Sequence, residues 1–109
     1  MKLYFYELDT EGYNEKPKGI LCTECEVEEK PKTYVPINGS KFPGYISRLK
    51  KDDIGHFISY NSNVVAFKEP SFEHAKEMFK NREKDRIENT KRKLDKLENE
   101  LKAIEESEE

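Results

Sequence analysis

The chain has 109 residues, a formal net charge of −3, 39% charged residues and 34% hydrophobic residues. This charge excludes a bulk electrostatic attraction to nucleic acid or to an anionic membrane. Six tyrosines and six phenylalanines argue against disorder, because disordered chains are poor in aromatic residues, so we expect one small, folded, soluble protein.

The sequence shows neither a signal peptide nor a membrane-spanning segment. The segment Met1–Glu7 has too few apolar residues for a signal peptide, and no later stretch approaches the roughly 18 consecutive apolar residues of a spanning helix. We therefore expect a cytoplasmic protein with no membrane partner.

Two strands are predicted near the N-terminus. Lys2–Leu8 is dense in aromatic residues, and Ile20–Glu29 alternates apolar and polar residues. Asp9–Gly19 between them is rich in turn-forming residues and is predicted to be a loop. The outer face of the second strand carries an acidic row, formed by Glu24, Glu26 and Glu28.

Two hairpins are predicted next. Thr33–Ile37 and Phe42–Leu49 flank Asn38-Gly39, and Asn-Gly is the strongest short hairpin signal because a type I′ turn needs positive φ at both central residues. Phe57–Tyr60 and Val64–Phe67 form the second hairpin around an asparagine-containing turn.

The remainder of the chain is predicted to be one long helix. No proline or glycine follows Pro70, and Ser71 is a good N-cap residue. About 36 helical residues span roughly 54 Å, whereas a body built from the rest would be about 28 Å across, so we expect the helix to overhang its domain. Its apolar residues recur at helical spacing: Phe72, Ala75, Phe79, Ile87, Leu94, Leu97, Leu101 and Ile104.

The predicted fold class is α+β, a small antiparallel sheet of hairpins followed by one long C-terminal helix. Residues 1–70 would form the β domain. Residues 71–109 would form the helix, whose first half packs on the sheet and whose second half serves self-association.

The distal helix has a heptad-like stripe, and its charges are segregated. Residues 80–96 hold eight basic and four acidic residues, a net of +4, and residues 97–109 hold one lysine and six glutamates, a net of −5. This gradient favours an antiparallel homo-oligomer, paired as a short coiled coil. A helix folded back on its own sheet is the alternative. The predicted contact residues are Ile87, Leu94, Leu97, Leu101 and Ile104.

Cys22 and Cys25 form a single C-x-x-C motif. A redox pair and a zinc site completed by His56 and His74 are the functional alternatives. Crowding by glutamates disfavours a thiolate, and residues three apart on a strand point to opposite faces. We therefore expect structural cysteines and no metal or other cofactor.

No catalytic constellation is present, so we expect a protein that is not an enzyme. A basic and aromatic surface is the candidate ligand site, because arginine binds phosphate bidentately and tyrosine rings stack on bases. An ordinary solvated face is the alternative. The candidate residues are Lys32, Tyr34, Tyr45, Arg48 and Lys50.

The runs Val27–Tyr34 and Tyr45–Gly55 resemble segments of small, uncharacterised proteins from phages and prophages of low-GC Gram-positive bacteria. Those proteins also look like a short β domain followed by a Lys/Glu-rich helix. The resemblance implies a virus-encoded accessory protein inside a bacterium, a group in which inhibitors of host immunity are common.

The function expected from the sequence is therefore non-catalytic oligomeric binding that counters host defence. The partner would be an anionic nucleotide signal, held by Arg48 and Lys50, or a defence protein whose basic groove binds the acidic row. A nucleic-acid-binding accessory protein that uses residues 80–96 and a structural assembly adaptor are the alternatives.

Overall fold

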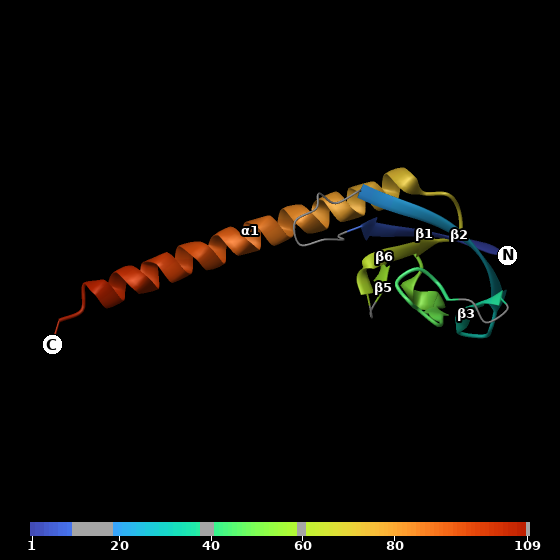
Figure 1. The fold of residues 1–109 in the computed structure, drawn as a ribbon, viewed down its shortest axis with the longest axis horizontal. Coiled ribbons are helices and arrows are strands. Elements are labelled where there is room, and N and C mark those ends of the chain that lie inside the picture. The colour runs from blue at the N-terminus through green and yellow to red at the C-terminus, as the bar shows by residue number, and fades with distance from the viewer. Residues whose placement is uncertain (10–18, 38–40, 59–60, 109) are drawn as a thin grey trace. The chain divides into compact units, whose positions relative to one another are not determined.

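The computed structural model describes residues 1–9, 19–37, 41–58 and 61–108. In these residues an antiparallel sheet of six strands precedes one long C-terminal helix (Figure 1), which confirms the predicted α+β class. The sheet order is β4-β3-β2-β1-β6-β5. The elements are β1 Lys2–Asp9, β2 Gly19–Glu29, β3 Thr33–Pro36, β4 Leu49–Lys50, β5 Phe57–Ile58, β6 Asn61–Phe67 and α1 Phe72–Glu105.

The chain divides into two compact units, Met1–Lys76 and Glu77–Glu109, which are described separately below. The first unit contains the whole sheet and the first turn of α1. The second consists of the rest of α1 and the C-terminal residues.

The central strand β1 is antiparallel to both of its neighbours, β2 and β6. Phe5 lies opposite Thr23 of β2 and Ala66 of β6, and Tyr6 lies opposite Cys22 and Val65. Because side chains alternate along a strand, Phe5 and Tyr6 point to opposite faces. Both are buried, so the described part of the sheet has apolar packing on each of its two faces at this strand.

The larger apolar cluster lies on the Phe5 face. Phe42 and Ile46, from the described residues between β3 and β4, belong to it, and the ring of Phe42 stacks on that of Phe5 with centroids 4.6 Å apart. Each large side chain buried in this way stabilises the fold by about 1.5 to 3 kcal/mol. The cluster comprises Leu3, Phe5, Val27, Tyr34, Phe42, Ile46, Leu49, Ile58, Val64 and Ala66.

The predicted return strand Phe42–Leu49 is wrong. Only Leu49 and Lys50 pair with β3, whereas Phe42 and Ile46 form an isolated bridge around a tight turn. This turn lets Phe42, Ile46 and Leu49 all reach the Phe5 face of the sheet, which a straight strand with alternating side chains could not do. The predicted Asn38-Gly39 turn lies outside the described residues.

The second predicted hairpin is confirmed as the antiparallel pair of β5 and β6. β5 comprises Phe57–Ile58, and residues 59–60 of the predicted strand lie outside the described residues. β6 begins at Asn61, inside the predicted turn. The pairing has a register shift between Phe57 and Ile58.

The Tyr6 face packs against the start of α1. The Tyr6 ring lies 5.9 Å from that of Phe67 and 6.2 Å from that of Phe72, measured between centroids. Ser71 occupies the predicted N-cap position, since the N–H of Ala75 donates to its carbonyl oxygen. Its hydroxyl donates to the carbonyl of Glu69 at 2.9 Å.

Candidate functional site

The five residues of the predicted ligand site differ in their surroundings. Tyr34 is only 1% exposed and belongs to the apolar cluster, with Lys51 Nζ 5.4 Å from its ring centroid. Its ring is therefore covered, whereas that of Tyr45 is 88% exposed. Lys50 pairs with Thr33 across β3 and β4. Lys32, Arg48 and Lys50 are exposed, and that they bind phosphate stays a prediction.

Two adjoining pockets open beside β2 and share Cys25, Lys41 and Phe42. Their volumes are about 540 Å³ and about 490 Å³. We call them the Ile37 pocket and the Tyr45 pocket. The Ile37 pocket is further lined by Glu24, Glu26, Pro36 and Ile37, and the Tyr45 pocket by Glu7, Thr23, Pro43, Gly44 and Tyr45.

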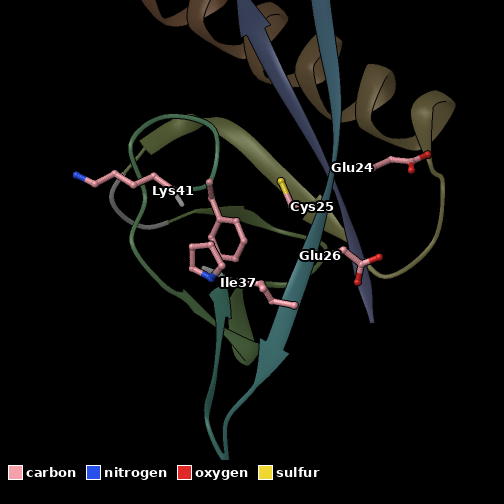
Figure 2. A pocket seen from close by; sticks show the side chains of 7 residues that line it. Glu24, Cys25, Glu26, Ile37 and Lys41 are labelled. Carbon is pink, nitrogen blue, oxygen red and sulfur yellow. The ribbon is translucent and has the colours of Figure 1, made fainter. Parts of the chain in front are cut away.

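Side-chain direction decides what each residue of the Ile37 pocket contributes. Figure 2 shows Cys25 pointing from β2 toward the pocket, whereas Glu24 and Glu26 point away on the opposite side of the strand. Lys41 extends away from Cys25. Strand alternation explains the difference between Cys25 and its two neighbours. The two glutamates therefore contribute backbone to the pocket, and its charged side chain is Lys41.

Tyr45 sits on a turn with an unusual backbone. Gly44 has φ +78° and Tyr45 has φ +61°, a left-handed conformation that is costly for a residue with a Cβ. The turn is closed by a 2.9 Å hydrogen bond from the N–H of Phe42 to the carbonyl of Ile46. Both of those side chains are buried, so the turn is anchored on the apolar cluster while it presents the Tyr45 ring to solvent.

The two cysteines lie on opposite faces of β2. Cys22 is opposite Tyr6 and Cys25 is opposite Leu3 in the register, which confirms the predicted alternation. Both are free thiols, Cys22 exposed and Cys25 partly buried. Burial raises the pKa of the Cys25 thiol above its ordinary value. Cys25 is therefore a neutral, weakly nucleophilic group at neutral pH.

The acidic row is matched by cations. Each of Glu24, Glu26 and Glu28, together with Glu29, has a positively charged partner within ion-pair distance, so the row carries little net charge. The hydrogen bond from Lys51 lowers the pKa of Glu29. The pairs are Glu24 with Lys2 (3.6 Å), Glu26 with the N-terminal amine (3.5 Å), Glu28 with Lys30 (2.9 Å) and Glu29 with Lys51 (2.7 Å).

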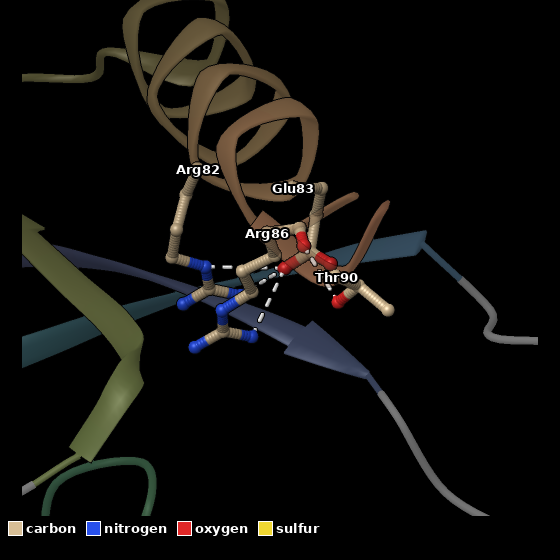
Figure 3. Close-up of polar contacts among 4 residues, drawn as sticks. All are labelled: Arg82, Glu83, Arg86 and Thr90. Atoms are coloured by element: carbon tan, nitrogen blue, oxygen red, sulfur yellow. Dashed lines mark hydrogen bonds and ion pairs between the residues drawn. The ribbon is translucent and has the colours of Figure 1, made fainter. Parts of the chain in front are cut away.

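The second unit begins with a polar cluster on α1. Figure 3 shows Arg82 and Arg86 converging on Glu83, with nitrogen to oxygen distances of 2.8 Å and 3.2 Å. The guanidinium of Arg82 also lies 5.1 Å from the ring centroid of Phe79. One turn later, the hydroxyl of Thr90 donates to the carbonyl of Arg86 at 2.8 Å. Arg82 and Arg86 therefore share a partner on their own helix.

The distal part of α1 exposes its predicted contact residues. The relative exposure of these five side chains runs from 54% to 70%. They recur at spacings of three, four and seven residues, which place them along one side of a continuous helix. We call them the apolar stripe: Ile87, Leu94, Leu97, Leu101 and Ile104.

Both histidines lie at the surface. His56 and His74 are exposed, and the His74 ring lies 5.1 Å from that of Phe67. Within the described ranges, no group of three or more His, Cys, Asp and Glu side chains is placed to hold a metal ion. In the same residues no helix has the length and apolar character to cross a bilayer.

No family model, curated protein or solved structure matches this chain.

The pockets also contain residues that the sequence did not indicate as ligand-binding, namely Lys41, Phe42 and Glu7. The Pro43-Gly44 pair between two apolar residues was a signal for a turn that carries Tyr45. Nothing in the sequence indicates that β1 brings Glu7 to the same pocket.

Proposed function

We propose that the protein is a non-catalytic binding protein that works as a homo-oligomer, through antiparallel pairing of the apolar stripe with that of a second copy. The exposure of the stripe carries this proposal. Burial of apolar surface contributes about 25 cal/mol per Å². A second copy offers a stripe of the same length and composition, so pairing covers both at once.

The layers of such a pair are complementary in size. Antiparallel alignment places Ile87 opposite Ile104, Leu94 opposite Leu97, and Thr90 opposite Leu101 of the second copy. The Thr90 hydroxyl is already bonded to the carbonyl of Arg86. It therefore enters the interface without an unsatisfied donor.

Charge selects the antiparallel orientation. Antiparallel pairing sets Lys91 beside Glu98 and Lys93 beside Glu100 of the second copy, whereas parallel pairing sets Arg86 beside Lys91. Lys91, Lys93 and Glu98 are exposed and, among the described residues, form no ion pair within their own helix. Lys91 and Glu98 can therefore pair between copies without breaking an internal ion pair, whereas Glu100, the partner of Lys93, already lies 4.0 Å from Lys96 on its own helix.

The structure offers less support for nucleic-acid binding through residues 80–96. Lys80, Arg82, Arg86 and Arg92 all have glutamate partners on α1. These partners weaken the local positive potential on which phosphate binding depends.

We further propose, from the resemblance to phage and prophage proteins, that the protein is a phage accessory protein that counters host defence. Ion pairing of the acidic row disfavours imitation of nucleic acid phosphates, so a nucleotide signal is the preferred target. Expression of the protein in a bacterial strain that carries a nucleotide-signalling defence system should then raise the plating efficiency of a phage that this system restricts. Unchanged plating across defended strains would contradict this setting and leave the oligomer proposal standing.

The decisive experiment on assembly is sedimentation equilibrium of the full chain and of Lys91→Glu. In the antiparallel pair this change sets two glutamates side by side twice per dimer, and we expect a dissociation constant raised about tenfold. Adding Glu98→Lys in the same chain should restore the affinity. In a parallel pair, Lys91→Glu would instead face Arg86 and strengthen association.

Lys102→Glu is the matched control, because it makes the same charge change at a position pointing away from the stripe. It should leave the dissociation constant within about twofold. A wild-type chain that stays monomeric at all concentrations, or a Lys91→Glu variant that associates more tightly, overturns the proposed pairing.

A further inference from the structure

We propose that the Ile37 and Tyr45 pockets together form one binding site for a free nucleotide, with the base stacked on Tyr45 and the phosphate at Lys41. This inference rests on the proposed function, which makes a nucleotide the preferred target, and it assigns the site and the residues that would hold the ligand. All of the lining residues lie between positions 7 and 45, within the first compact unit.

The Tyr45 turn is built to present an aromatic ring. The left-handed φ of +61° disfavours any residue with a Cβ, and glycine would fit there without strain. A tyrosine that is 88% exposed buries little surface in return. Backbone strain without a packing gain is typical of functional positions. The buried anchors Phe42 and Ile46 fix the backbone of the turn beside the pocket, so stacking would order only the exposed Tyr45 side chain.

The lining supplies the other groups that a nucleotide needs. Base stacking on an exposed aromatic ring is a general mode of nucleotide recognition. Lys41 borders both pockets on a flexible stem and can reach a phosphate bound in either of them. Glu7 can accept hydrogen bonds from the amino or imino groups of a base, and Thr23 can donate or accept.

The size and polarity of the site agree with this ligand class. Volumes of about 490 Å³ and about 540 Å³ are typical of small-molecule sites. Phe42 and Cys25, which both pockets share, supply apolar surface between the polar groups. Because Glu24 and Glu26 point away (Figure 2), their carboxylates do not face a phosphate in the Ile37 pocket.

A free nucleotide and the end of a nucleic acid strand share this chemistry. We commit to the free nucleotide, because Lys41 is the one basic side chain among the described residues that line the two pockets, and a strand needs cations for its successive phosphates. Isothermal titration with GMP and AMP on one arm, and with a single-stranded octanucleotide on the other, distinguishes the two sources. Tighter binding of the octanucleotide overturns the assignment to a free nucleotide.

The test compares four variants of the full chain, each checked for its fold by circular dichroism. We expect Tyr45→Ala and Lys41→Ala each to weaken GMP or AMP binding about tenfold or more, which is the size of effect that one stacking or phosphate contact gives. Tyr45→Phe keeps the ring and should bind like the wild type. Arg48→Ala is the matched control, an exposed cation of the same segment that lines neither pocket.

Cys25 provides a second readout. In a Cys22→Ser background, bound nucleotide should slow alkylation of Cys25, the thiol at the centre of the site. The proposal is overturned if wild-type protein binds neither nucleotide at millimolar concentration, or if Arg48→Ala loses as much affinity as Lys41→Ala. The Lys91→Glu variant should retain binding, so loss of dimerisation and loss of the ligand site are separable results.

Discussion

The phenolic oxygen of Tyr6 accepts a 2.7 Å hydrogen bond from the backbone N–H of Ser71. This bond joins the central strand to the residue that precedes α1, and the Tyr6 side chain is almost completely buried. Tyr6→Phe would keep the ring and leave that N–H without its partner. We expect a loss of about 1 to 2 kcal/mol in the free energy of unfolding, measured by urea denaturation. Tyr4→Phe, on the same face of β1, is the control and should change it by less than about 0.5 kcal/mol.

Tyr6 should also make the free energy of unfolding depend on pH. Burial raises the pKa of Tyr6 above its usual value of 10.0, so the unfolded chain releases this proton at a lower pH than the folded chain does. The stabilisation from neutral Tyr6 is complete below pH 10 and is lost as pH rises through the folded pKa. The difference in unfolding free energy between wild type and Tyr6→Phe should therefore shrink above pH 10. A difference that stays constant to higher pH would contradict a raised pKa.

The two thiols should differ in reactivity. Cys22 is exposed, whereas burial both covers Cys25 and raises its pKa. At pH 8 we expect iodoacetamide to modify Cys22 several-fold faster than Cys25, measured by mass spectrometry on the Cys25→Ser and Cys22→Ser variants. Equal rates in the folded protein would contradict this placement. Equal rates in denaturant are the expected control.

Tyr45→Gly should separate stability from binding. Glycine accepts the left-handed backbone at position 45, so the change relieves strain of about 1 kcal/mol, partly offset by the greater freedom of glycine in the unfolded chain. We expect the midpoint of urea unfolding to stay equal or rise while nucleotide affinity falls. Tyr45→Ala keeps the strain and loses the ring, so it should bind as poorly without gaining stability.

The sequence predicted the long elements well because their patterns are dense and local. β1 is dense in aromatic residues, β2 alternates apolar and polar residues, and the apolar residues of α1 recur at helical spacing. The strand predicted over Phe42–Leu49 is wrong because Phe42, Ile46 and Leu49 do not share the period of two that a strand requires. Their burial is decided by a tight turn and by the distant ring of Phe5, which is a tertiary contact that local spacing does not encode.

The candidate ligand site likewise depends on tertiary contacts that the sequence does not indicate. Tyr34 and Tyr45 look alike in sequence, since each lies in a polar and basic context, yet one is buried and the other is exposed. Tyr34 is buried because its strand pairs with β4, opposite Leu49, and its ring packs in the apolar cluster. Tyr45 is exposed because it lies on the left-handed turn. Both depend on contacts between segments, so only Tyr45 of the two aromatic candidates remains available to a ligand.

The Thr90 layer gives the last prediction. In the proposed antiparallel pair Thr90 faces Leu101 of the second copy, and it is the one polar member of the three layers. Thr90→Leu would add apolar surface to two symmetric layers per dimer. Each gain of about 1 kcal/mol adds to the other, so we expect the dissociation constant to fall at least tenfold in sedimentation equilibrium. Asn89→Leu, one residue away and off the stripe, is the control and should leave it nearly unchanged. If both variants tighten association equally, added hydrophobicity rather than the layer is responsible, and the proposed register is wrong.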